Sequence, residues 1–288
     1  MINKIHITVF AVITVLYLLV AIWKYAPDFN ELNDPLTDEQ NAARQTIVQF
    51  WDVYNTATSY RVQRNYEQAA DYYSKALELN SRHEDALYYL GSMHLFLRNF
   101  EKTEKYLQSL EEIIPNSPRS HLQLGTLYYC MDDSNELFNL EKAKQRFETA
   151  WELNREETGT PLLLSKIALL EQEYEKAYNL LDIVTASNTM SYQAIFLSGY
   201  INWLDGIENS GISQLQKAIN TYQNLAYAEV QGEGTTETGA RAMLSEDRFC
   251  DPFEIEIERL LENSIQLDIN TIYSVFNKTM NRWRPEHS

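Results

Sequence analysis

Histidines are the first residues whose type and spacing invite a chemical interpretation. His94 and His121 fall in two helical segments that are separated by one other helix, and imidazole is a common zinc ligand. A metal pair is conceivable, but no carboxylate or cysteine stands at ligand spacing beside them. We therefore expect two core histidines with protein partners, and predict no metal site.

A glycine-rich stretch, residues 232–239, is the second candidate for chemistry. It lacks the Gly-Lys-Ser/Thr ending of a phosphate-binding loop, and no strand precedes it. No nucleophile elbow or zinc-protease motif occurs, and the many glutamates follow surface positions of helices. We predict a loop here, no catalytic residue, no cofactor and no enzyme activity. A small enzyme or ligand-binding site at residues 232–248 stays open as an alternative.

Cys130 and Cys250 are the two cysteines, 120 positions apart. Two cysteines are too few for a disulfide framework or a cysteine-rich zinc site. One disulfide is possible, but two buried, unreactive thiols are the favoured interpretation.

Charge and composition exclude several classes of protein. The 288-residue chain carries a net charge of −17, whereas nucleic-acid binding needs a basic face that releases counterions from phosphates. Hydrophobic residues make up 44%, enough for a large core. Only 9 Gly and 7 Pro are present, which excludes collagen-like and low-complexity chains.

The N-terminal region contains an apolar run from Ile5 to Trp23 without a single Asp, Glu, Lys or Arg. As a helix it would be about 28 Å long, which matches a bilayer's hydrocarbon core. Lys4 and Lys24 flank it, and no small-residue cleavage site follows, so an anchor is favoured over a signal peptide. We predict a single-pass protein of a bacterial inner membrane with its soluble domain in the periplasm.

The soluble domain shows a repeated helical pattern. Tyr66, Ala69, Tyr73 and Ala76 are spaced as on one helix, and the pairs Leu90-Gly91 and Leu124-Gly125 recur 34 positions apart in two later helices. Small residues let two helices cross closely while large neighbours fill the space around them. This pattern resembles the tetratricopeptide repeat (TPR) family, whose units of 34 residues each form a helical hairpin.

The resemblance implies an all-α fold, a right-handed TPR solenoid with C-terminal capping helices behind an N-terminal transmembrane helix. Five units begin near Phe50, Glu84, Pro118, Thr158 and Tyr192, and the third has six extra residues between its helices. The predicted divisions are an anchor at 1–25, a linker at 26–37, the solenoid at 38–223, and a loop with capping helices at 224–288. Thr37 and Gln40 form a capping-box pattern at the solenoid's start.

The family's inner face follows fixed positions of each first helix, which gives a candidate partner-binding surface. Its aromatic and basic content, in so acidic a chain, is typical of a groove for a peptide or helix. The candidate residues are Trp51, Tyr54, Arg61, Tyr88, Phe96, Arg119, Leu122, Tyr129, Lys166, Phe196, Tyr200 and Trp203.

These features together predict a membrane-tethered protein–protein interaction module. It would act as a scaffold, assembly factor or accessory subunit of a membrane protein complex. A cytoplasm-facing targeting receptor is the remaining alternative.

Overall fold

The computed structural model describes residues 37–230, 248–263 and 268–284. Within those ranges the chain is helical, with no β-strand. The predicted anchor from Ile5 to Trp23 and the glycine-rich stretch at 232–239 lie outside the described residues. None of the helices in the described ranges has the length and apolar character needed to cross a membrane.

The chain divides into two compact units, Met1–Gln49 and Phe50–Ser288. The described part of the first unit contains the start of helix α2 (Asp38–Val62). The predicted capping box is present there. The Thr37 amide donates to Gln40 Oε1 at 2.9 Å, and the Gln40 amide donates to Thr37 Oγ1 at 3.2 Å. These two bonds satisfy amides that the first turn of a helix otherwise leaves without partners.

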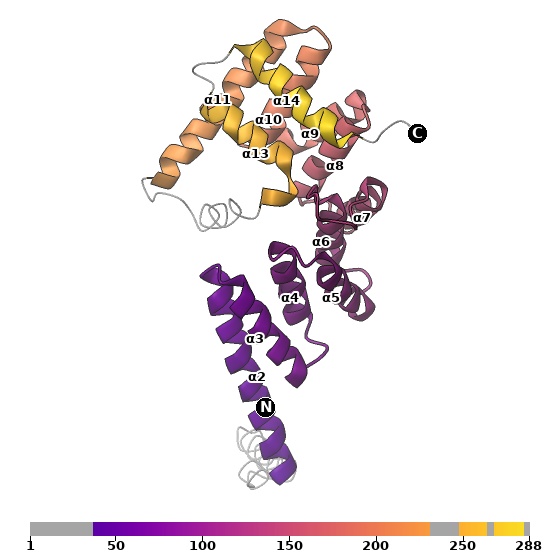
Figure 1. The fold of residues 1–288 in the computed structure, drawn as a ribbon, viewed down its shortest axis with the longest axis vertical. Helices are drawn as coiled ribbons and strands as arrows, with labels where there is room; N and C mark the ends of the chain where they lie inside the picture. Colours follow the sequence, from indigo (N-terminus) through magenta and orange to yellow (C-terminus); the bar gives the residue numbers. More distant parts are fainter. Residues whose placement is uncertain (1–36, 231–247, 264–267, 285–288) are drawn as a thin grey trace, which may run out of the picture. The chain divides into compact units, whose positions relative to one another are not determined.

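The second unit is a series of helical hairpins followed by a C-terminal pair of helices (Figure 1). The hairpins pair α2 with α3 (Tyr66–Leu79), α4 (Glu84–Phe96) with α5 (Phe100–Ile113), α6 (Pro118–Tyr129) with α7 (Leu140–Leu153), α8 (Gly159–Leu170) with α9 (Tyr174–Ser187), and α10 (Tyr192–Leu204) with α11 (Glu208–Val230). A short 3-10 turn η2 (Arg248–Cys250), α13 (Pro252–Glu262) and α14 (Ile269–Trp283) follow.

The turns inside the hairpins confirm the 34-residue spacing. Arg64, Arg98, Gln172 and Gly206 have positive φ, and each lies between the two helices of its hairpin. Successive differences are 34, 74 and 34, and 74 equals two repeats plus the six predicted extra residues. Those residues lie in the α6–α7 connection, 130–139, which replaces the tight turn of the other hairpins.

Glycine at the helix crossing has the predicted role. A Cβ added at Gly91 would lie 2.9 Å from Leu107 Cδ2 of α5, and one added at Gly125 would lie 2.5 Å from Phe147 Cδ1 of α7. Both distances are too short for a carbon–carbon contact. The glycines are therefore required for the close approach of α4 to α5 and of α6 to α7.

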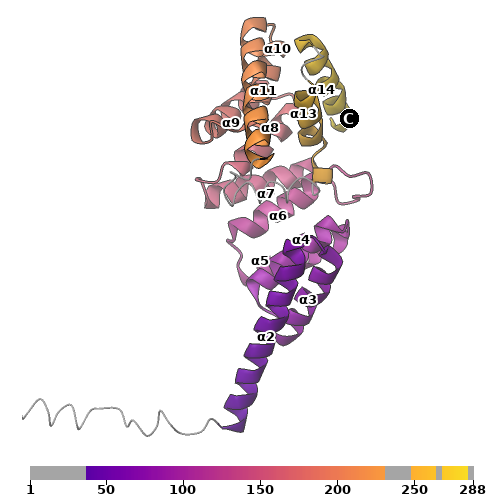
Figure 2. The ribbon, with the colours of Figure 1, turned by 90° about the vertical axis from the view of Figure 1, so that its left-hand side faces the viewer.

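The C-terminal helices pack along the later hairpins (Figure 2). Helix α13 contacts α10 and α11, and α14 contacts α8. The buried face of α14 is formed by Ile272, Tyr273, Phe276 and Met280, which belong to the same core cluster as α8 and α10. The tail therefore covers side chains of the first helices in hairpins four and five, in addition to contacting α11.

Candidate binding groove

A groove of about 500 Å³ opens along the first helices of the first four hairpins. Tyrosine, phenylalanine and leucine side chains make up much of its wall, with a few hydroxyl and amide groups. The lining residues are Arg61, Tyr66, Tyr88, Tyr89, Ser92, Met93, Leu95, Phe96, Leu122, Gln123, Thr126, Gly159, Leu163 and Cys250. Four of the predicted partner-binding residues, Arg61, Tyr88, Phe96 and Leu122, are among them.

Arginines stack on the tyrosines of this region. The Arg61 guanidinium lies 4.3 Å from the centre of the Tyr89 ring, and its Nε donates to the Tyr73 hydroxyl at 3.2 Å. Arg119 lies 4.0 Å from the Tyr88 ring centre and forms a 2.9 Å ion pair with Asp85. Each guanidinium lies over its ring and is attracted to the ring face, so both the ring and the charge are pre-positioned.

Tyrosine hydroxyls near the first hairpin remain protonated at neutral pH. Burial raises the pKa of Tyr73, although its hydrogen bonds with Thr58 and Arg61 act in the opposite direction. Burial, aided by Tyr73 and Asp85, raises the pKa of Tyr54 to about 12. Neither hydroxyl is therefore a base or nucleophile at ordinary pH, and both act as neutral hydrogen-bonding groups.

Two predicted groove residues near the start of the domain lie outside the groove wall. Trp51 and Tyr54 belong to an aromatic cluster with Phe50 and His83, in which neighbouring ring centres lie 4.6–5.8 Å apart. Trp51 is nevertheless 48% exposed. The first helix of hairpin one thus presents its aromatics beside the groove, and Arg61 inside it.

The later predicted residues are covered by the protein's own C-terminal helices. Phe196 and Tyr200 are fully buried, and the Phe196 ring centre lies 5.1 Å from that of Phe276 in α14. Tyr200 donates its hydroxyl hydrogen to Asn277 Oδ1 at 2.7 Å, and Trp203 Nε1 donates to Asn270 Oδ1 at 2.8 Å. In this arrangement the second half of the predicted surface is occupied, so it is not available to another protein.

Lys166 is the clearest correction to the predicted groove. Its side chain is 2% exposed, and its Nζ lies 2.5 Å from Asp251 Oδ2 and 2.7 Å from Gln193 Oε1. Asp251 also caps α13 by accepting from the Phe253 and Glu254 amides. Lys166 therefore binds the start of the C-terminal helix pair, because a buried ammonium group requires a carboxylate partner.

Tyr129 is also buried rather than exposed in the groove. Its ring centre lies 6.1 Å from that of Phe147. Burial, together with the Asp251 and Glu254 carboxylates, raises the pKa of Tyr129 well above its ordinary value. The residue contributes to the core between α6, α7 and the start of α13.

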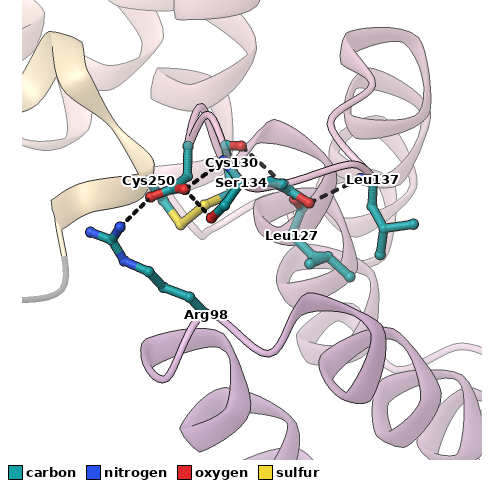
Figure 3. Close-up of a disulfide and its surroundings, with 8 residues drawn as sticks. Arg98, Leu127, Cys130, Ser134, Leu137 and Cys250 are labelled. Atoms are coloured by element: carbon teal, nitrogen blue, oxygen red, sulfur yellow. Dashed lines mark hydrogen bonds and ion pairs between the residues drawn. A yellow bond between two sulfur atoms is a disulfide. The ribbon is translucent and has the colours of Figure 1, made fainter.

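A disulfide joins the groove wall to the C-terminal helices, and the expectation of two thiols was wrong (Figure 3). Cys130, directly after α6, pairs with Cys250 of η2, and the Met131 amide donates to the Cys250 carbonyl at 3.1 Å. Asn135 supports this bend by donating to the carbonyls of Leu127 and Cys130 at 2.9 and 3.0 Å. Arg98 pairs with Asp132 at 3.0 Å and lies 4.8 Å from the Phe249 ring centre.

The histidines have separate protein partners, as expected. The His94 ring stacks on Tyr106 with centres 5.5 Å apart, and burial lowers the pKa of His94 to about 4. His121 Nε2 lies 3.1 Å from the Pro115 carbonyl oxygen, and its Nδ1 lies 3.0 Å from Arg146 Nη1. Within the described residues the two rings do not form a shared site with other ligating side chains.

Several groove residues were missed from the sequence. Tyr89 and Gln123 follow the predicted positions by one residue, and Tyr66 belongs to a second helix, which the inner-face positions do not include. The signal for Lys166 was present, because a lysine in the apolar helix Gly159–Leu170 indicates a buried acidic partner.

The hairpin order, spacing and groove define an all-α helical-hairpin solenoid of the TPR type. In solved structures this fold is similar to the protein MamA, with a TM-score of 0.51 and 16% identity over 59% of this chain and 96% of that one. A MamA RS-1 double mutant matches with a TM-score of 0.53 and 11% identity, over 61% and 95% of the two chains. TTC0263, a thermophilic TPR protein in Thermus thermophilus, matches with a TM-score of 0.50 and 16% identity, over 76% and 100%.

At these identities the similarity shows the fold alone. No protein-family model matches the chain, and no curated protein matches it.

Proposed function

We propose that this protein is a non-enzymatic interaction module that binds a segment of a partner protein in the open groove. The observation that carries the proposal is the groove wall itself, in which Tyr88, Tyr89 and Phe96 stand beside the stacked Arg61. Aromatic and arginine side chains dominate protein-binding energies because they bury large areas with little loss of conformational freedom.

We further propose that the domain is tethered to a membrane through the segment from Ile5 to Trp23 and acts outside the cytoplasm. The disulfide between Cys130 and Cys250 supports that location, since such bonds persist in oxidising compartments such as the periplasm. It is evidence against the cytoplasm-facing receptor. Tethering raises the effective concentration of the groove toward membrane proteins, as suits a scaffold, assembly factor or accessory subunit.

Site-specific photo-crosslinking in intact membranes tests the groove. Phe96 is replaced by p-benzoylphenylalanine, and Tyr178 of α9, 40% exposed and outside the groove wall, is replaced in a matched control. We expect one discrete crosslinked membrane protein from position 96 and none from position 178. Equal or absent crosslinking at the two positions would contradict the groove assignment.

The membrane orientation is tested separately by protease accessibility. In intact spheroplasts the described domain should be digested by added protease, whereas a cytoplasmic control protein should be spared until lysis. Protection of the domain in intact spheroplasts would place it in the cytoplasm and would contradict the proposed location.

A further inference from the structure

The C-terminal helices cover the part of the inner face around Lys166, Phe196 and Tyr200, here called the covered half. This covered half shows what kind of segment the solenoid accepts. Helix α14 presents Ile272, Tyr273, Phe276 and Met280 to the core, and these positions form one stripe along a helix. Asn277, at the edge of the stripe, accepts the hydrogen bond from Tyr200. The bound element is therefore an amphipathic α-helix with an apolar stripe and a polar group at its flank.

The open groove has related apolar chemistry but smaller side chains at one repeat position. Tyr88 and Leu122 stand at the repeat position that Phe196 has in hairpin five, whereas Ser92 and Thr126 replace the large Tyr200. The hydroxyls of Ser92 and Thr126 donate to carbonyls of their own helices at 2.9 Å each. The groove floor therefore needs no polar partner, and its small residues leave room for apolar side chains.

Charge distinguishes the two halves. Among the described residues, Arg61 is the one charged side chain in the groove wall. Its Nε donates to Tyr73, and no carboxylate of the described residues forms an ion pair with it. In the covered half, by contrast, the buried Lys166 already has Asp251. A partner carboxylate would therefore complete the pairing of Arg61.

We infer that the open groove binds an amphipathic α-helix of a partner protein, with an apolar stripe in the groove and a Glu or Asp at its flank pairing with Arg61. The inference rests on the proposed function and specifies the chemistry of the partner.

A set of fluorescent peptides tests this directly against the full-length protein in detergent. The parent peptide has the sequence of α14, Ile269–Trp283, because its stripe is known to fit an inner face of this solenoid. One version carries Asn277→Glu and Thr279→Glu, which flank the stripe, and its matched control carries Lys at both places. A third adds Ser274→Pro to the Glu version, which interrupts the helix but keeps the stripe. Binding is measured by fluorescence anisotropy.

We expect the Glu peptide to bind about ten-fold more tightly than the Lys peptide, as one charge-assisted hydrogen bond allows. The proline version should bind at least about ten-fold more weakly than the Glu peptide, because it must order its backbone on binding. In the Arg61→Gln protein the preference for Glu should vanish, and in Arg61→Lys part of it should remain. Arg155→Gln, which removes an arginine stacked on Trp151 outside the groove, should change nothing.

Four outcomes would overturn the inference. Equal affinity for the Glu and Lys peptides would contradict the ionic pairing with Arg61. Equal affinity for the proline version and the Glu peptide would contradict binding as a helix. If no peptide binds, or if Arg61→Gln leaves binding unchanged, this groove is not the site for such a helix. The proposed function would still stand in each case if position 96 crosslinks to a discrete partner, and it fails separately if that crosslink is absent.

Discussion

The open groove and the covered half of the inner face are built from the same helical repeat, and one repeat position shows most clearly how they differ. In hairpins two and three that position holds Ser92 and Thr126, whose hydroxyls bond to their own helices. In hairpins four and five it holds Lys166 and Tyr200, whose polar ends reach α13 and α14. Polar groups that a helix cannot satisfy by itself require a partner, and here the same chain supplies it.

A matched pair of phenylalanine substitutions should show the largest difference between the two regions. Phe276→Ala in α14 removes a fully buried ring and should lower the free energy of unfolding by about 3–5 kcal/mol. Phe96→Ala removes a partly buried ring in the groove wall and should cost under about 1.5 kcal/mol. Urea denaturation followed by circular dichroism measures both. Similar costs would mean that α14 is not packed as described.

The buried ion pair should give the next largest effect. Lys166→Met leaves the Asp251 carboxylate in the core without its cation, which should cost about 3–5 kcal/mol. Adding Asp251→Asn should recover part of that loss, because the amide needs no counter-charge. Lys144→Met, which breaks the more exposed pair with Glu171, is the control and should cost at most about 1 kcal/mol. A mild effect at Lys166 would show that water reaches this site.

Reduction of the disulfide should increase the motion of the covered half more than that of the open groove. Loss of the Cys130–Cys250 bond should destabilise the folded state by about 2–4 kcal/mol, since it closes a long loop. Hydrogen exchange should then quicken in α13 and α14 while α4 and α5 stay protected. The double variant Cys130→Ser, Cys250→Ser should behave like the reduced protein. Uniform loss of protection would instead mean that both regions unfold together.

The pH-dependent contribution of His94 to the free energy of unfolding should be the smallest of these effects. His94 belongs to α4, which lines the open groove. Burial, with Lys102 adding to it and Asp71 opposing it, lowers the pKa of His94 from 6.5 to about 4. Neutral His94 is favoured by folding, so its contribution is present above pH 6.5 and is lost as the pH falls toward 4. The loss should be at most about 3 kcal/mol, since one pKa unit corresponds to about 1.4 kcal/mol.

The difference in unfolding free energy between wild type and His94→Gln, measured from pH 7 to pH 4, isolates this contribution from that of the carboxylates. A difference that does not change with pH would contradict the lowered pKa. His121→Gln serves as the comparison for a histidine that has its own polar partners.

Local sequence patterns predicted the features that depend on near neighbours. The capping box at Thr37 and Gln40, the glycines at helix crossings and the six extra residues of the third hairpin all involve contacts within one repeat. Their physical basis is backbone hydrogen bonding and close helix packing, which require particular residue types at regular spacings in the sequence. The groove residues Arg61, Tyr88, Phe96 and Leu122 followed from the same regular frame.

Tertiary structure alone decided which part of the inner face is occupied. Lys166 meets Asp251 across 85 positions, Tyr200 meets Asn277 across 77, and Cys130 meets Cys250 across 120. Local periodicity does not predict such pairs. They form only because the whole C-terminal helix pair packs back against the earlier hairpins. The sequence by itself therefore determined a repeating solenoid with an aromatic inner face, and only the packing of α13 and α14 divided that face into a covered half and an open groove.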